Sequence, residues 1–329
     1  MIDENGSFRD PAGKIYYEDN RVFRKLTALG TERFLELQNI NIISKSIEKG
    51  FLVETKVIKN QNKNDENKNE LILEHKKIPY ISYPYEWSFS QLKDAAIFHL
   101  DFHLFLLKNN ATLIDASAYN IQFIGSKLKF IDVLSVQKYN EGEFWVGHKQ
   151  FCENFLNPLI LKSKKGIKFN NWFKGNLEGI ETRELNNLLG VFDKFSYNIF
   201  VHIYLLNKFD EKYKSKKSLK PISQTKKQFS KKSFVALLSQ LRKFILKLKD
   251  YKNVTTWDDY SINNTYSDLD KIQKKDCIKE FCKKNTFDLI ADLGCNNGEY
   301  SILSLNNGCK KVVGFDFDIN AIDEAYRSE

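Results

Sequence analysis

The chain has 329 residues, which is long enough for two domains that each bury a core. Hydrophobic residues make up 42% of it, with 26 Phe and 15 Tyr, and this composition excludes an intrinsically disordered protein. The net charge is +9, but the excess of lysine is concentrated in one segment, so it does not indicate a uniformly basic surface. Apolar runs fall short of the roughly 18 residues that span a bilayer, and we expect no transmembrane segment.

The N-terminus and the cysteines both favour a cytoplasmic protein. Met-Ile-Asp-Glu-Asn-Gly lacks the basic and apolar regions of a signal peptide. The odd number of cysteines and their scattered positions form neither a Cys-x-x-Cys pair nor a zinc-ligand spacing, so a reduced, cytoplasmic setting is predicted. The cysteines are Cys152, Cys277, Cys282, Cys295 and Cys309.

The first 85 residues read as a small β-rich lobe. Turn signals at Asp10–Gly13 and Glu18–Asn20 separate strand-like runs that end at Leu26. A helical stretch is expected from about 31 to 48, followed by strands at 51–58 and 71–73. The polar segment 59–70 between those strands predicts an exposed hairpin tip.

A helical lobe is expected over residues 86–207. Ser88 is the predicted N-cap of a long helix that runs to Lys108, and residues 143–207 read as mainly helical. We therefore predict an α+β module over residues 1–207, composed of a small lobe (1–85) and a helical lobe (86–207).

Three polar residues between these helices suggest phosphoryl-transfer chemistry. Asp115 and Asn120 form Asp-x-x-x-x-Asn, and a hydrophobic strand that ends in Asp132 follows. This arrangement resembles the catalytic segment of protein kinases and small-molecule kinases. The resemblance implies that Asp115 orients the acceptor hydroxyl and that Asn120 and Asp132 hold Mg²⁺ against the phosphates of ATP.

The rest of a kinase site matches this chain less well. Leu113 stands where those families often have His, and no glycine-rich phosphate loop is evident near the N-terminus. The nucleotide-anchoring cation would be Arg24 or Lys25. Glu32 or Glu36 on the next helix would be its partner. The alternative is that Asp115 and Asn120 only cap turns.

Three histidines in this module are candidate ligands. His99 and His103 are spaced i, i+4 on the long helix, like a metal pair, but ordinary helix-face histidines explain them more simply. His148 follows Asp132 by 16 residues and either reaches a substrate cleft or packs beside Trp145.

A lysine-rich segment at 208–232 is predicted to be a linker. Such a run can also contact nucleic acid or an anionic membrane. It lacks the interleaved aromatic residues of a single-strand binder, and no nucleic-acid partner is predicted. The following helix has an apolar stripe of Leu237, Leu241, Phe244 and Leu248 and is expected to dock on a domain core.

Residues 233–329 are predicted to contain this linker helix and the start of a nucleotide-binding α/β domain. Two apolar runs, 287–291 and 311–315, read as buried parallel strands, and the turn and helix between them complete a βαβ unit. Asp316 ends the second strand 18 positions after Gly298, where a carboxylate can accept both ribose hydroxyls.

The turn is Asp-x-Gly-x-x-x-Gly, not the dinucleotide Gly-x-Gly-x-x-Gly. It resembles motif I of class I S-adenosylmethionine (SAM)-dependent methyltransferases. The resemblance implies that the loop wraps the methionine part of SAM and that the strand-end carboxylate holds the ribose. The alternative is a tight βα turn of another α/β protein. The implied cofactor-binding residues are Asp292, Gly294, Cys295, Asn296, Asn297, Gly298 and Asp316.

Longer segments resemble bacterial class I SAM-dependent methyltransferases, some of which are described as nodulation-protein-like. The similarity runs from about residue 6 to the end of the chain and is carried by 83–96, 115–123, 130–135 and 150–158. It implies methyl transfer from SAM to an acceptor that the sequence does not identify. Because the region 233–329 has two strands where about six are needed, the domain is expected to be incomplete, as a fragment or with a separate chain completing it.

The predicted fold class is therefore an α+β kinase-like N-terminal module followed by an incomplete α/β Rossmann-like (class I methyltransferase) domain. SAM-dependent methyl transfer is the first functional hypothesis. An Mg-ATP-dependent phosphotransferase is the enzymatic alternative. The non-enzymatic alternative is a binding module that presents a substrate or partner.

Overall fold

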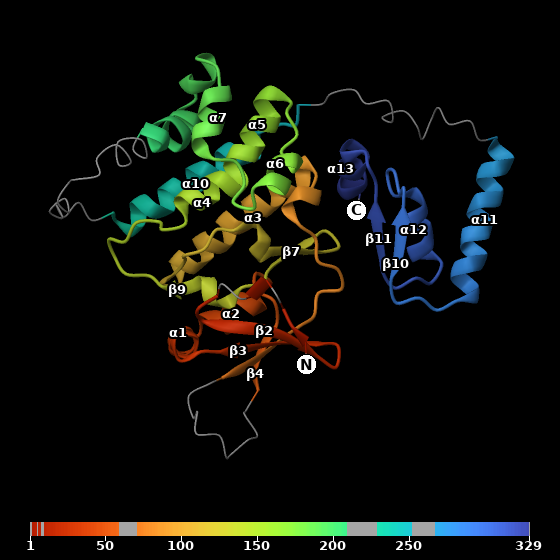
Figure 1. Ribbon diagram of the computed structural model, residues 1–329, viewed down its shortest axis with the longest axis horizontal. Coiled ribbons are helices and arrows are strands. Elements are labelled where there is room, and N and C mark those ends of the chain that lie inside the picture. The colour runs from red at the N-terminus through yellow and green to blue at the C-terminus, as the bar shows by residue number, and fades with distance from the viewer. Residues whose placement is uncertain are drawn as a thin grey trace. The chain divides into compact units, whose positions relative to one another are not determined.

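The computed structural model describes residues 2–4, 6–7, 10–58, 71–208, 229–251 and 267–328. The chain divides into two compact units, one of 1–85 and 93–249 and the other of 86–92 and 250–329 (Figure 1). The hairpin tip expected at 59–70 and most of the linker expected at 208–232 lie outside the described residues.

The first unit opens with a five-stranded antiparallel sheet in the order β1-β2-β3-β5-β4. A two-residue turn at Asp19 and Asn20, with φ of 47° and 62°, joins its longest strands. Positive φ at both positions matches the type I′ hairpin, so the turn expected at 18–20 is confirmed. The strands are β1 (Ile2–Asp3), β2 (Gly13–Glu18), β3 (Arg21–Leu26), β4 (Thr55–Ile58) and β5 (Ile72–His75).

Two helices, α1 (Ala28–Asn39) and α2 (Ile42–Glu48), replace the single stretch expected at 31–48. Asn41 adopts a left-handed conformation (φ 56°) that ends one helix and begins the next. A side chain at Gly30 would place its Cβ 1.9 Å from the carbonyl oxygen of Ala12. Glycine therefore lets α1 pack directly on the Asp10–Gly13 turn, which holds Asp10 in place for the site described below.

A long helix and a pair of small antiparallel ladders follow. Helix α3 (Phe89–Lys108) begins as predicted, with the Ser88 hydroxyl accepting a 3.3 Å bond from the Gln91 N–H. Backbone bonds from Val53 to Phe130 (3.0 Å) and from Phe130 to Phe51 (2.8 Å) connect β8 to the segment before β4. The ladders pair β6 (Ala111–Leu113) with β9 (Val136–Lys138), and β7 (Ile121–Ile124) with β8 (Lys127–Phe130).

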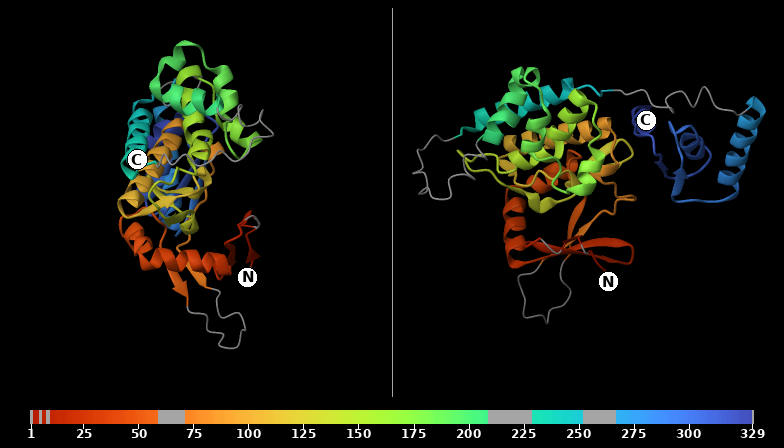
Figure 2. Two further views of the ribbon diagram at one scale, coloured as in Figure 1. Left: turned by 90° about the vertical axis from the view of Figure 1, so that its left-hand side faces the viewer. Right: turned by 45° about the horizontal axis from the view of Figure 1, so that its top comes forward.

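Helices make up most of the remainder of this unit (Figure 2). Two π-helical segments, η5 and η7, interrupt them. The elements are α4 (His148–Phe151), η5 (Cys152–Leu156), α5 (Asn157–Lys165), α6 (Asn170–Gly175), α7 (Thr182–Leu188), α8 (Tyr197–Ile199), η7 (Phe200–Leu205) and α10 (Lys231–Lys247); short 3₁₀ turns are η2 (Pro84–Glu86), η3 (Ala118–Asn120), η4 (Val133–Ser135) and η6 (Phe192–Phe195).

Helix α10 belongs to the first unit, which differs from the domain boundary expected at 233. The Phe234 ring of α10 lies against His103 and Trp145. Arg242 of the same helix forms a bidentate ion pair with Asp101 of α3, at 2.5 and 2.9 Å. Docking on a core is confirmed, although the buried stripe differs from the expected one in two of its positions. The buried residues are Phe234, Leu238, Leu241, Ile245 and Leu248.

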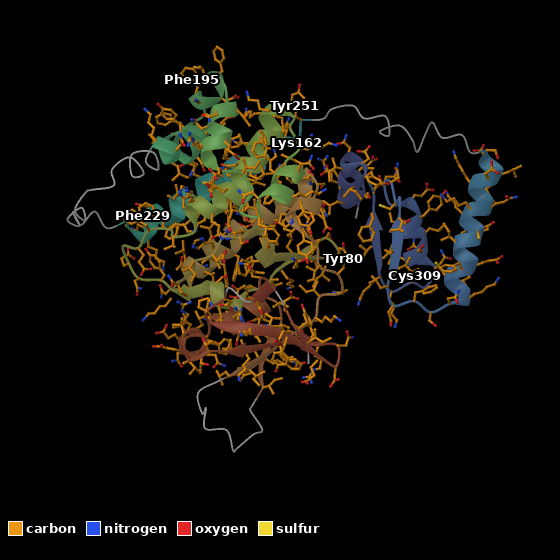
Figure 3. The ribbon with its side chains drawn as sticks, viewed as in Figure 1. Tyr80, Lys162, Phe195, Phe229, Tyr251 and Cys309 are labelled. Atoms are coloured by element: carbon orange, nitrogen blue, oxygen red, sulfur yellow. The ribbon has the colours of Figure 1, made fainter. Side chains whose placement is uncertain are left out.

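The second unit contains a parallel two-stranded sheet with a crossover helix. Strands β10 (Ile290–Leu293) and β11 (Val312–Phe315) pair in parallel, and α12 (Glu299–Asn306) connects them. The predicted parallel βαβ pairing is confirmed, with β10 beginning three residues later than expected. The expected burial is wrong, because every residue of β10 and β11 is half-buried or exposed. Helices α11 (Asp268–Lys284) and α13 (Ile319–Ser328) flank it. Figure 3 labels Cys309, which lies between α12 and β11. The Cys309 thiol lies 3.3 Å from that of Cys282 on α11.

Within the described part of the chain, none of the helices combines the length and apolar character that crossing a membrane requires.

Candidate functional site

The turn after β10 has the backbone geometry of a ligand-binding loop. Gly294, Asn296 and Gly298 have φ of 78°, 49° and 83°, which is the left-handed region that favours glycine. A Cβ at Gly294 would meet no atom within 4 Å, so this backbone faces open space. The turn is held by bonds from the Gly294 and Cys295 N–H groups to the Phe315 carbonyl, at 2.8 and 3.0 Å.

Asp316, at the end of β11, is bound to the same turn. One carboxylate oxygen accepts the N–H of Asn296 and the other accepts the N–H of Asp318, both at 2.8 Å. Each carboxylate oxygen can accept more than one bond, so the group can still receive hydroxyl donors. The structure thus brings the predicted loop and the predicted carboxylate together.

The other predicted loop residues have different roles. Asp292 accepts a 2.6 Å bond from the Ser301 hydroxyl, a partner that the sequence analysis did not single out. Asn297 donates its N–H to the side chain of Asn296 at 2.7 Å. Cys295 is buried, and burial, followed by the charges of Asp292 and Asp316, raises its thiol pKa to about 11. Cys295 is therefore a packing residue of the loop, not a reactive thiol.

In the first unit, Asp115, Asn120 and Asp132 lie in one cluster. The Asn120 side-chain amide reaches the Ser135 hydroxyl at 3.5 Å, and that hydroxyl donates to Asp132. Asp115 accepts the N–H of Ser117 at 2.7 Å. Burial raises the pKa of Asp115; the negative charge of Asp132 adds to the rise, and hydrogen bonds from Ser117, Gln150 and Asn120 oppose it.

Arg24 of β3 closes this cluster with two ion pairs. Its guanidinium contacts Asp132 at 2.5 Å and also Asp10 in the turn beneath α1. The Arg24 side chain is 7% exposed, and the two carboxylates are about a quarter exposed. Of the two candidate cations, Arg24 therefore reaches the cluster, but its partners are Asp10 and Asp132; Glu32 and Glu36 are exposed on α1.

This cation determines the charge state of Asp132. Burial alone would raise the pKa of Asp132, but the charge of Arg24 and the hydrogen bonds from Ser135, Arg24 and the Leu134 N–H outweigh it and lower the pKa. Asp132 is thus an anion neutralised by Arg24. A Mg²⁺ ion at Asp132 would have to compete with that guanidinium.

Two of the three histidines noted in the sequence, His99 and His103, are core residues, and His148 is half-buried. His99 and His103 are both 0% exposed, and His103 pairs with the Thr112 hydroxyl at 2.8 Å. Burial lowers the pKa of His99 to about 3, so its ring is neutral. His148 packs beside Trp145, with ring centroids 5.3 Å apart, and also contacts His202, a residue that the sequence analysis did not consider.

The fold and these clusters define a mixed α/β protein with an Arg-neutralised carboxylate cluster in one unit and a parallel βαβ ligand loop in the other. No established family profile matches the chain. It is 37% identical over 323 residues to the nodulation protein NoeA of Rhizobium meliloti (strain 1021), covering 98% of this chain and 67% of that protein. The chain therefore belongs to the family of nodulation protein NoeA.

Among solved structures, the chain is similar to vaccinia related kinase 3, and the match covers 77% of this chain and 81% of the kinase chain. The sequence identity is 13% and the TM-score 0.34. The superposition is loose, and the comparison by itself does not assign a kinase fold.

Proposed function

We propose that the second unit binds S-adenosylmethionine and that the protein serves in methyl transfer from it. The observation that carries this proposal is the pairing of a left-handed Gly294, facing open space, with a carboxylate that is hydrogen-bonded to the same turn. A loop and strand-end acid at the carboxyl ends of parallel strands is the usual place for a nucleoside ligand in α/β folds.

The residues present fit such a ligand. Asp316 can accept ribose hydroxyls, and the backbone at Gly294 leaves space for close approach. Ser301 and Asp292 hold the first strand end to α12 and so keep the loop in shape. When bound, SAM supplies an electrophilic methyl group; the contribution of this chain is to orient it toward an acceptor.

We expect the chain to bind SAM, and Asp316→Asn to weaken that binding by about tenfold or more. The substitution removes a charged acceptor, and hydrogen bonds to charged groups contribute about 1.5–3 kcal/mol. Gly294→Ala should also weaken binding, because a left-handed alanine costs about 1–2 kcal/mol and its methyl group enters the open space. Isothermal titration calorimetry with SAM and with S-adenosylhomocysteine measures both effects.

Matched controls exist for both substitutions. Asp288→Asn removes an exposed carboxylate of the same unit, which pairs with Lys310, and should leave SAM affinity unchanged. Gly175→Ala adds a methyl group where nothing lies within 4 Å and no positive φ is required. Equal affinity in Asp316→Asn and Asp288→Asn, or no SAM binding by the folded unmutated chain, would refute the proposal for this chain.

A second candidate function, an Mg-ATP-dependent phosphotransferase, is supported by the clustering of Asp115, Asn120 and Asp132. Under this hypothesis ATP should raise the unfolding temperature of the chain only when Mg²⁺ is present, and Asp132→Asn should abolish the effect. Asp101→Asn, which removes a carboxylate of α3 that pairs with Arg242 outside the cluster, is the control. ATP binding that does not depend on Mg²⁺, or no ATP binding at all, would refute this second function.

The Arg24–Asp132 pair favours a third reading of the first unit, as a kinase-like module that binds a partner without catalysis. A guanidinium already neutralises the carboxylate that would hold Mg²⁺. The name of the relative associates that protein with nodulation, and we extend a nodulation-related role to this chain as part of the proposal.

A further inference from the structure

Three side chains with metal-binding atoms converge in the helical part of the first unit. They are His148 of α4, Cys152 at the start of η5 and His202 of η7. One ligand atom from each lies within 4.8 Å of the other two. Cys152 and His202 are 0% and 1% exposed, whereas His148 is partly exposed, so an ion could enter past its ring.

The distances are close to those of a tetrahedral zinc site. The Cys152 sulfur lies 3.7 Å from His148 Nε2, and His148 Nε2 lies 2.8 Å from His202 Nδ1. Zn–N bonds of about 2.0 Å and Zn–S bonds of about 2.3 Å place a nitrogen and a sulfur about 3.6 Å apart and two nitrogens about 3.3 Å apart. The first distance fits directly, and the second requires the two rings to separate by about half an ångström.

Local helix geometry explains why these atoms meet. His148 and Cys152 are spaced i, i+4, which places them on the same face of a helix. Two π-helical segments, η5 and η7, carry Cys152 and His202. Such wide turns are rare and occur often at functional sites, because they redirect side chains that a regular helix would place elsewhere.

A purely structural explanation accounts for only part of the cluster. Each neutral imidazole has one N–H and one lone pair, so a single proton between the two rings satisfies their 2.8 Å contact. That contact does not use the Cys152 thiol, whose sulfur is a weak hydrogen-bond partner at 3.7 Å. To bind a metal ion, the ring that donates in this contact would carry its proton on its other nitrogen, and the thiol would release one proton to solvent, so that all three atoms present lone pairs.

We propose that His148, Cys152 and His202 bind one zinc ion, with a fourth position open to water or another small ligand. One thiolate and two imidazoles are donors that Zn²⁺ accepts and that Mg²⁺ and Ca²⁺ do not prefer. The site would connect η7 to α4 and η5. The two histidine ligands, His148 and His202, are 54 residues apart in the sequence. The two cysteines near each other in the second unit, Cys282 and Cys309, lack a histidine partner among the described residues.

The test starts with the full chain freed of metal by a chelator and dialysed against Zn²⁺, followed by metal analysis. We expect one zinc per chain and an increase of several degrees in the unfolding temperature. Substitution by Co²⁺ should produce thiolate-to-cobalt charge-transfer absorption together with the visible bands of a tetrahedral ion. This spectrum is recorded on the unmutated chain and does not depend on how any variant folds.

Variants then assign the ligands. Cys152→Ser, which nearly preserves the side-chain volume, and His202→Gln should each lose zinc binding. Cys152→Ser should also lose the thiolate-to-cobalt charge-transfer band. Cys309→Ser and His75→Gln are the controls and should retain both. No uptake of Zn²⁺, uptake that survives Cys152→Ser and His202→Gln, or binding of copper to the exclusion of zinc would each overturn the proposal.

Discussion

Replacing Arg24 by Met is expected to lower the free energy of unfolding of the first unit by about 3 kcal/mol near pH 7. The guanidinium lies almost wholly buried between Asp10 and Asp132. Removing the cation leaves two carboxylates close together with only partial access to water. Loss of one partner of a buried pair costs about 3–5 kcal/mol, and the lower end applies because both carboxylates are about a quarter exposed.

The same variant should respond to pH in the opposite sense from the wild type. Arg24 lowers the folded-state pKa of Asp132, so this group stabilises the wild type above its unfolded pKa, and the contribution is lost as the pH falls through the lowered value. In Arg24→Met, burial raises the pKa of Asp132, and the cost of its charge disappears on protonation. The stability difference should therefore narrow between about pH 7 and about pH 4.

Urea unfolding at the two pH values measures this difference. Arg21→Met is the matched control, because Arg21 lies on the same strand and pairs with Glu74 at the surface, with its side chain 52% exposed. Solvent screens an exposed ion pair, so the free energy of unfolding of the control should change little. Equal losses in the two variants, or a difference that does not depend on pH, would contradict the assigned role of Arg24.

Replacing Phe234 by Ala should lower the stability of the first unit by about 3–5 kcal/mol, the usual cost of removing a buried phenyl ring. Phe234 is 1% exposed, and its ring centroid lies 5.2 Å from that of His103 and 5.7 Å from that of Phe229. The small cavity would be lined by aromatic rings that cannot collapse without moving α10 away from α3.

Hydrogen–deuterium exchange identifies the unit that is affected. Exchange should accelerate in α3 and α10 and remain unchanged in β10 and β11, because α10 belongs to the first unit. Leu246→Ala, on the same helix at 45% exposure, should leave exchange almost unaltered. Faster exchange in α10 and residues 267–328, with α3 unchanged, would instead place α10 with the C-terminal unit.

Local signals in the sequence predicted most of the elements. The cap at Ser88, the turn at Asp19 and Asn20, and the parallel strands around the Gly294 loop all follow from residues close together in the chain. Such features depend on backbone preference and on hydrophobic periodicity, which are properties of short segments. The break at Asn41 was missed, because a single left-handed residue leaves little trace in periodicity.

The candidate sites contain both residues that were predicted from the sequence and partners that were not. Asp316 was predicted from its spacing after Gly298, since a βαβ unit brings strand ends together by itself, and Asp292 and Gly294 were predicted from the resemblance to the methyltransferase loop motif. The partners Asp10 of Arg24 and His202 of His148 were not, because they lie 14 and 54 residues away in the sequence and meet only through packing.

The sequence by itself determined the order of strands and helices, the Gly294 loop and the carboxylate that closes it, because each depends on neighbouring residues. Only the tertiary structure decided that Arg24 neutralises Asp132, that α10 packs with the first unit, and that the ligand atoms of His148, Cys152 and His202 lie together. The physical reason is that burial and charge pairing depend on which side chains become neighbours and exclude water. Residues far apart in the sequence become neighbours only when the chain folds.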